Sequence, residues 1–179
     1  FYRPLYRLAM QVLHKDGTNE RLPIHLVLSS EWNYSPHIYR PLDFLENFIL
    51  IGFPASESSN PLVLPLAGHE LGHAYWRMSL DYNDIESKAG TILYDILFKE
   101  AGKNPKLKVV LNQYPFLREY AKRQAQETFC DFSGLRIFGS SFLFAFSYLL
   151  SPGVGADQPL LYPAIWRRVK NLKKAAITF

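Results

Sequence analysis

Residues 66–76 of this chain read Leu66-Ala67-Gly68-His69-Glu70-Leu71-Gly72-His73-Ala74-Tyr75-Trp76. On a helix, two histidines four positions apart lie on one face, one turn from each other. Imidazoles at this spacing can bind the same zinc ion. Glu70 is offset from His69 by about 100° around the helix, beside the metal, where it can deprotonate a zinc-activated water. The stretch therefore predicts a helical zinc site.

The neighbouring residues extend the helical stripe that carries both histidines: Leu62, Leu66 and Trp76. The histidines are therefore expected to face inward. The alternative is that His69 and His73 are ordinary histidines beside a solvated glutamate. Gly68 and Gly72 weaken that alternative, because each costs about 1 kcal/mol in a helix interior relative to alanine. Close approach of a strand or a substrate would explain both glycines.

A catalytic zinc ion needs a third protein ligand. The best source is a long predicted helix whose core-facing stripe includes two carboxylates: Phe116, Leu117, Tyr120, Gln124, Glu127, Asp131, Leu135 and Phe138. Buried carboxylates require a partner, so we assign Glu127 as the metal ligand. Asp131 would accept a proton from the free ring nitrogen of a ligand histidine. The reverse assignment stays open, and Glu86 or Asp84 is a further alternative.

At this point the chain resembles the gluzincin metallopeptidases, and more narrowly the minigluzincins and the endopeptidase family that includes the CAAX prenyl proteases. In these proteins a His-Glu-x-x-His helix is followed by a helix with Glu-x-x-x-Asp, matched here by Glu127 and Asp131. The resemblance spans residues 49–139. It implies a zincin-like fold, and a strand at Glu46–Phe53 whose edge binds an extended peptide. The membrane-bound relatives have flanking transmembrane helices that this sequence lacks, so a soluble relative is the better match.

A developing oxyanion usually needs a hydrogen-bond donor besides zinc. The candidate donors are Tyr162, Arg167 and His37, and further choices are Arg168 and Tyr148. For Tyr162 and Arg167 the competing interpretation is structural, as an aromatic residue at a helix start and a solvated helix face. Cys130 faces away from the carboxylates on the same helix, so we expect a buried side chain that is neither nucleophile nor ligand.

Hydrophobic periodicity and turn residues predict the order of elements. We expect strands at Pro23–Leu28 and Phe48–Phe53, and helices at residues 1–14, from Pro61 or Pro65 to Leu80, and at 85–101, 115–138, 141–150 and 162–174. Helices therefore dominate. The predicted fold class is α+β, a mostly helical domain with a small sheet packed beside the helix of the zinc motif.

The chain has 179 residues, 48% of them hydrophobic and 20% charged, which suits one compact domain over residues 1–179. It opens on Phe1, so we expect a fragment of a longer protein. Its net charge of +4 comes from Lys and Arg dispersed along the sequence, which gives no support for nucleic-acid binding. The single cysteine favours a reducing compartment, and hence the cytoplasm. The longest apolar run, Phe142–Leu150, is too short to span a membrane.

Together these features predict a zinc metalloendopeptidase that acts on a peptide or protein substrate. Zn²⁺ would be bound by His69, His73 and Glu127, with Glu70 as general base and Asp131 behind a ligand histidine. The alternative is a regulatory or sensor module that keeps the zincin fold and is non-catalytic or cuts a single partner. The sequence does not indicate an oligomeric state.

Overall fold

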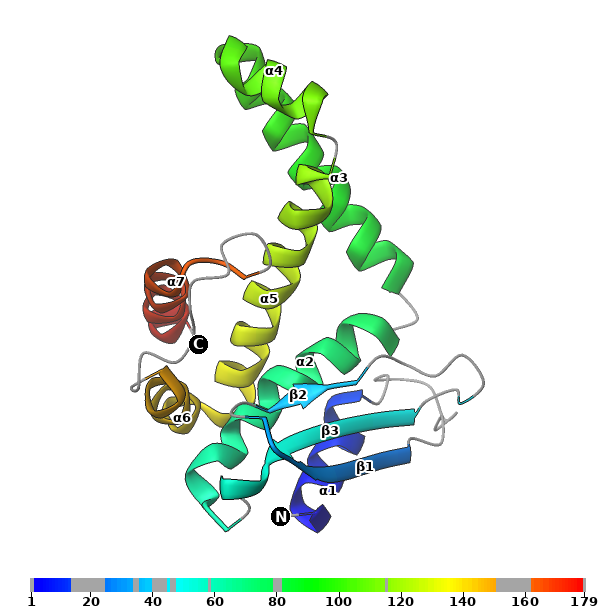
Figure 1. The fold of residues 1–179 in the computed structure, drawn as a ribbon, viewed down its shortest axis with the longest axis vertical. Coiled ribbons are helices and arrows are strands. Elements are labelled where there is room, and N and C mark those ends of the chain that lie inside the picture. The colour runs from blue at the N-terminus through cyan, green and yellow to red at the C-terminus, as the bar shows by residue number, and fades with distance from the viewer. Residues whose placement is uncertain are drawn as a thin grey trace.

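The computed structural model describes residues 2–13, 25–33, 36–39, 45, 48–57, 59–78, 82–114, 116–150 and 162–178, and the structural statements below concern these residues. Within them the chain is mostly helical, with one small sheet (Figure 1). In chain order the elements are α1 (Tyr2–Leu13), β1 (His25–Glu31), β2 (His37–Ile38), β3 (Phe48–Pro54), the 3₁₀ segments η1 (Ala55–Glu57) and η2 (Pro61–Leu66), α2 (Ala67–Met78), α3 (Tyr82–Lys103), α4 (Pro105–Gln113), α5 (Leu117–Phe138), α6 (Ser140–Leu150) and α7 (Ile165–Thr178).

The sheet has the order β1-β3-β2. Strands β1 and β3 are parallel, with Leu26 opposite Ile49, and β2 is antiparallel to β3, with Ile38 opposite Ile51. Successive side chains of a strand point to opposite faces, so the buried Leu26, Ile49 and Ile51 lie on one face. Helices α1 and α2 cover that face through Leu5, Ala9, Ala67, Leu71 and Ala74.

The prediction that the edge of Glu46–Phe53 is free to bind a peptide is wrong for the described part of that strand. β3 is the central strand, because β1 pairs with one of its edges and β2 with the other. A strand as short as β2 has too little periodicity to be seen in the sequence. Among the described strands, β2 is therefore the edge strand that contacts α2.

A second hydrophobic cluster lies on the other side of α2, where α5, α6 and α7 pack together. It contains Leu135 of α5, Phe142 and Phe146 of α6, and Leu172 and Ala175 of α7. Phe142 is fully buried and stacks on Phe146 with the ring centroids 5.7 Å apart. One face of the apolar run of α6 is therefore part of the core, and no described helix is long and apolar enough to cross a membrane.

Most of the expected elements are present, with shifted ends. The helix with the zinc motif starts as 3₁₀ at Pro61, where the Asn60 side chain accepts a hydrogen bond from the Leu62 amide, and becomes α-helical at Ala67. The long helix ends as predicted at Gly139, whose φ of 57° suits glycine. The last helix begins at Ile165, three residues later than predicted. Residues 23–24, part of a predicted strand, lie outside the described residues.

Helix α4 is missing from the sequence prediction. It follows Asn104, whose side chain accepts hydrogen bonds from the amides of Lys106 and Leu107. Helix α4 contains no buried residue, although Leu107, Val110 and Leu111 have the spacing of one helical face, a signal that was overlooked. Together α3 and α4 extend away from the sheet, at the end of the molecule farthest from it (Figure 1).

Candidate metal centre

The candidate site lies where α2 and α5 pack against each other with almost no side chain between them. A Cβ at Gly68 would lie 2.9 Å from the Gly134 Cα, and a Cβ at Gly72 would lie 2.9 Å from the Cys130 Cα. The two glycines therefore allow the backbones of the two helices to approach. The expected close approach is present, but the neighbour is a helix and not a strand or a substrate.

This contact brings together the three predicted metal ligands. Glu127 Oε2 lies 3.3 Å from His69 Nε2, and Glu127 Oε1 lies 3.6 Å from His73 Nε2. The two imidazole rings are edge to face, with centroids 4.9 Å apart. Two donors bound to one zinc ion at about 2.0–2.1 Å in tetrahedral geometry are about 3.3 Å apart. The spacing of the donors therefore suits a zinc ion among them.

Asp131 is held behind His69 by an arginine from α7. Asp131 Oδ1 lies 3.0 Å from His69 Nδ1, and Arg168 donates two hydrogen bonds, at 2.7 Å and 2.6 Å, to the two carboxylate oxygens. Burial opposes ionisation of Asp131, but the hydrogen bonds from Arg168 and His69 lower its pKa. The ionised carboxylate accepts, so His69 Nδ1 donates and His69 Nε2 faces Glu127.

Glu127 Oε2 is buried and has no hydrogen-bond partner among the described residues. This oxygen therefore indicates whether the site is suited to a cation. If His69 is neutral and donates from Nδ1, its Nε2 carries a lone pair directed at this oxygen. Two facing lone pairs repel in a buried site and are compensated only by a positive charge between them. A proton or a metal ion can supply that charge. The donor set thus fits a divalent cation.

The ionisation of the two histidines differs because only His69 has Asp131 behind it. Burial lowers the pKa of His69, but the hydrogen bond to Asp131 and the nearby Glu127 outweigh it and raise the pKa to about 10. Burial and the charge of His69 lower the pKa of His73 to about 4. The neutral imidazole of His73 has a free lone pair, as a metal ligand requires.

Cys130 is buried, as expected, but it does not face away from the site. Its sulfur and one ring nitrogen of each of His69 and His73 all lie within 4.8 Å of one another. Burial and then the charge of Glu127 raise the pKa of the thiol well above its ordinary value. The two oxygens of Glu127 lie 3.3 Å and 3.6 Å from the imidazole nitrogens, so we take Glu127 as the third donor, with Cys130 as the competing one.

Glu70 is buried beside the donors and lies between α2 and the edge strand β2. Burial raises the pKa of its carboxyl to about 7, partly opposed by the charge of His69 and by a hydrogen bond from the Ile38 backbone. The Tyr39 amide donates to the Leu50 carbonyl of β3. Amides alternate between the two edges of a strand, so the Ile38 amide lies on the edge of β2 that faces away from β3. Glu70 and this edge therefore face each other.

The candidate oxyanion donors lie in different places. Tyr162 is partly exposed, and burial, followed by the charge of Glu127, raises the pKa of its hydroxyl. The ring of His37 lies over Gly52 of the sheet, 4.8 Å from the ring of Tyr39. Arg167 is exposed, with its guanidinium over the Trp166 ring. The ring of His37 therefore lies on the sheet and the guanidinium of Arg167 on the exposed face of α7, whereas the Tyr162 hydroxyl is within electrostatic range of Glu127.

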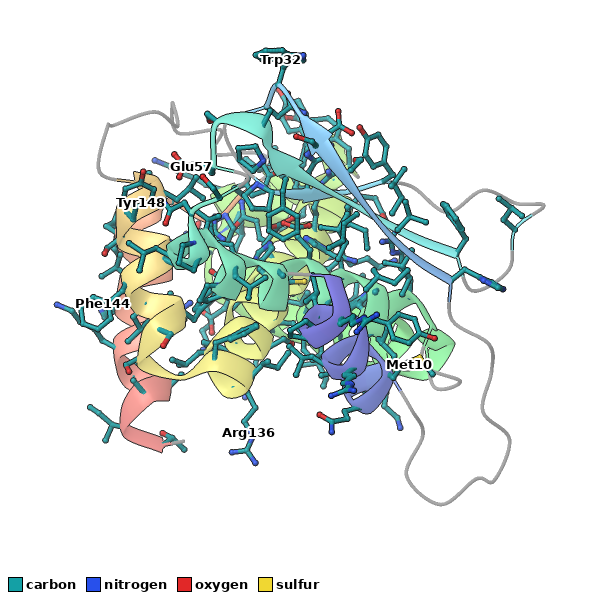
Figure 2. All side chains as sticks on the ribbon, turned by 90° about the horizontal axis from the view of Figure 1, so that it is seen from below. Met10, Trp32, Glu57, Arg136, Phe144 and Tyr148 are labelled. Atoms are coloured by element: carbon teal, nitrogen blue, oxygen red, sulfur yellow. The ribbon has the colours of Figure 1, made fainter. Side chains whose placement is uncertain are left out.

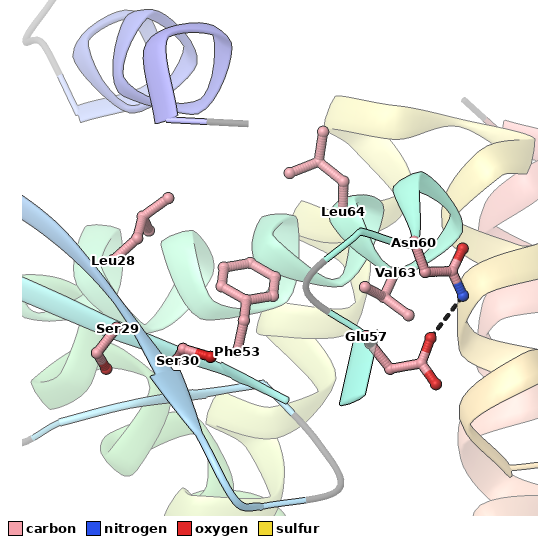
Figure 3. Close-up of a pocket in the computed structure, with 8 residues that line it drawn as sticks. All are labelled: Leu28, Ser29, Ser30, Phe53, Glu57, Asn60, Val63 and Leu64. Carbon is pink, nitrogen blue, oxygen red and sulfur yellow. Dashed lines mark hydrogen bonds between the residues drawn. The ribbon is translucent and has the colours of Figure 1, made fainter. Parts of the chain in front are cut away.

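A separate cavity of about 200 Å³ opens between the sheet and η2 (Figure 3). It is lined by Leu28, Ser29, Ser30, Phe53, Glu57, Asn60, Val63 and Leu64. The Glu57 carboxylate accepts a hydrogen bond from Asn60 at 2.6 Å and another from the Tyr148 hydroxyl at 3.1 Å. Glu57 and Tyr148 also lie close together in Figure 2. Tyr148 is therefore engaged at this cavity, whose lining includes none of the predicted ligands.

Sequence reasoning missed two features of the site. Arg168 was considered only as an oxyanion donor, although its spacing of four from the buried Leu172 places it on the inner face of α7. The position of Ile38 beside Glu70 has no local signal, because it depends on the pairing of β2. The side chains of Asp84 and Glu86, the alternative ligands, lie outside the part of the chain that the structure describes.

Comparison with protein-family models, with curated proteins and with solved structures finds no match to this chain.

Proposed function

We propose that this chain is a zinc-dependent metalloendopeptidase, a hydrolase with a zincin-like domain of the gluzincin type. The observation that carries the proposal is the convergence of His69, His73 and Glu127 from two helices, at distances that suit tetrahedral zinc. The chemical nature of the set adds support, since two histidines and a carboxylate form a catalytic type of zinc site that leaves one position open.

His69, His73 and Glu127 would hold the ion, and Asp131 would fix the orientation of His69 through Nδ1. Zinc bound by such a set supplies a Lewis acid for the scissile carbonyl and acidifies water. The side chains of His69 and His73 remain 12% and 15% exposed, whereas that of Glu127 is 4% exposed. The open side of the donor set is therefore formed by the histidines, and a substrate would approach from there.

Glu70 would act as the general base, taking a proton from the attacking water and passing it to the leaving amine. Its buried carboxylate follows His69 directly in α2 and lies beside the edge of β2 that faces away from β3, where the Ile38 backbone donates to it. An extended peptide can add to such an edge by main-chain hydrogen bonds. We assign this role to β2 instead of β3, and we assign Tyr162 as the additional oxyanion donor.

The test combines zinc content with hydrolysis of a mixed peptide library. Glu70→Gln should retain one zinc per chain and lose at least about a hundredfold of the hydrolysis rate, the usual contribution of a general base. Glu119→Gln makes the same chemical change at a side chain that is 73% exposed on α5, and it should hydrolyse as the wild type does. Full activity in Glu70→Gln would refute the assignment. Stoichiometric zinc without any turnover in the wild type would favour the regulatory or sensor module.

A further inference from the structure

Helix α7 has two faces of different character. Its inner face contributes the buried Leu172 and Ala175 to the second hydrophobic cluster, and it directs Arg168 to Asp131. The opposite face carries residues spaced by four, three and four positions, which places them in one stripe: Trp166, Lys170, Lys173 and Ile177. Trp166 is 62% exposed and Ile177 is 89% exposed. A tryptophan and an isoleucine therefore project outward between lysines.

The positive charge of the chain is concentrated in α7. The exposed surface of this helix carries four cations: Arg167, Lys170, Lys173 and Lys174. With the inner Arg168, α7 has five basic residues and no acidic one. The net charge of the whole chain is only +4, so the rest of the chain is slightly negative. The net positive charge of the chain therefore resides on α7, whereas the sequence led us to expect it to be spread along the chain.

We propose that the outer face of α7 docks the protein on an anionic lipid surface. A basic helix with Trp and aliphatic residues on its exposed side is the composition of helices that lie in the membrane interface. The cations complement lipid phosphates, and the interface accommodates the amphipathic ring of tryptophan. Nucleic acid would satisfy the cations but offers no apolar layer in which to bury Ile177.

The binding is peripheral, because no described helix is long and apolar enough to cross a membrane. Helix α7 lies beside α6, and the labelled Phe144 of α6 points outward from the molecule (Figure 2). Phe144 is 73% exposed. Docking would leave the inner face of α7 on Asp131, so the candidate metal centre would lie behind the bound helix. This surface does not depend on the proposed hydrolysis.

The test is co-sedimentation of the full chain with vesicles of phosphatidylcholine alone or with three parts in ten of phosphatidylglycerol. We expect binding to the anionic vesicles, weak binding to the neutral ones, and weakening in 0.5 M salt, since salt screens the attraction. Lys170→Glu/Lys173→Glu should bind at least tenfold less tightly, because each cation near an anionic surface contributes a factor of about five. Lys106→Glu/Lys108→Glu makes the same charge change on exposed residues of α4 and should stay within twofold of wild type.

Fluorescence tests the apolar contact separately. In a Trp32→Phe background, Trp166 is the exposed tryptophan, since Trp76 is only 6% exposed, and its emission should shift to the blue on anionic vesicles. Ile177→Ser should weaken binding severalfold with little effect on folding, which circular dichroism verifies. Equal losses in the α7 and α4 double variants would overturn the proposal. So would an unshifted emission, or binding to duplex DNA without binding to vesicles.

Discussion

Arg168 and Asp131 form a buried ion pair, whose two charges are both largely removed from water. The side chains are 13% and 2% exposed, and two charge-assisted hydrogen bonds join them. Taking both charges out of water is costly, and their mutual attraction only partly offsets that cost. The pair is therefore poorly explained as a stability device. It is better explained by what it does to Asp131, which it keeps ionised and directed at His69.

We expect Arg168→Met to lower the free energy of unfolding by about 3–5 kcal/mol, because it leaves the Asp131 carboxylate buried without its main partner. Asp131→Asn/Arg168→Met removes both charges and keeps an oxygen that can accept from His69. It should therefore be more stable than Arg168→Met alone. Urea denaturation monitored by circular dichroism measures both values. A double variant less stable than the single one would contradict this account.

The contact between α2 and α5 is the arrangement of elements on which the site depends. Two donors come from α2 and one from α5, so their separation is set by how closely the helix backbones approach. Gly68 and Gly72 permit that approach, and Gly72 faces the Cα of Cys130 and the side chain of Ser133. The two glycines would weaken α2 as an isolated helix, but the close packing of α5 against α2 requires them.

Gly72→Ala tests this helix contact. Alanine favours the helix by about 1 kcal/mol, but its Cβ would lie 2.9 Å from backbone, which cannot move aside alone. We expect a net loss of about 1–3 kcal/mol in unfolding free energy, as for other overpacked cores, together with weaker zinc binding. The control is Gly102→Ala in α3, where a Cβ would meet nothing within 4 Å. That variant should be neutral or stabilised by up to about 1 kcal/mol. If Gly72→Ala were stabilised to the same degree, α2 and α5 could move apart without cost, and the close contact would not be required.

For the whole molecule, the donor set connects two hydrophobic clusters. Leu71 and Ala74 of α2 belong to the cluster of the sheet and α1, whereas Leu135 of α5 belongs to the cluster with α6 and α7. A metal bound by His69, His73 and Glu127 would therefore link the two parts. Because the donors come together only in the folded chain, metal binding would stabilise the whole fold.

Zinc at a free concentration of a hundred times its dissociation constant should raise the unfolding free energy by about 2.7 kcal/mol. Urea denaturation with and without a chelator measures this gain. Glu127→Ala should lose most of it, while Cys130→Ser should keep it. The opposite result would make Cys130 the third ligand and would be detected without any activity assay.

The sequence also allowed most of the architecture to be predicted, and the limits of that prediction have identifiable causes. Long helices with an apolar stripe, such as α1 and α5, were predicted to within a few residues. Helix α4 was missed although Leu107, Val110 and Leu111 have helical spacing, and β2 was missed because two residues show no period. Arg167 was also preferred over Arg168 as a site residue, although Arg168 is the one that contacts Asp131. Neighbouring positions differ by 100° on a helix, and only packing decides which one faces inward.

The sequence by itself determined the His-Glu-x-x-His motif, the helical stripe that carries Glu127 and Asp131, and the helical character of the chain. These follow from spacing within one element, where helix geometry relates residues three or four apart. Tertiary structure alone decided that Glu127 lies between the two histidines, that Arg168 holds Asp131, and that Ile38 of the edge strand faces Glu70. Each of these contacts joins residues more than thirty positions apart, and the packing of α2, α5, α7 and the sheet brings them together.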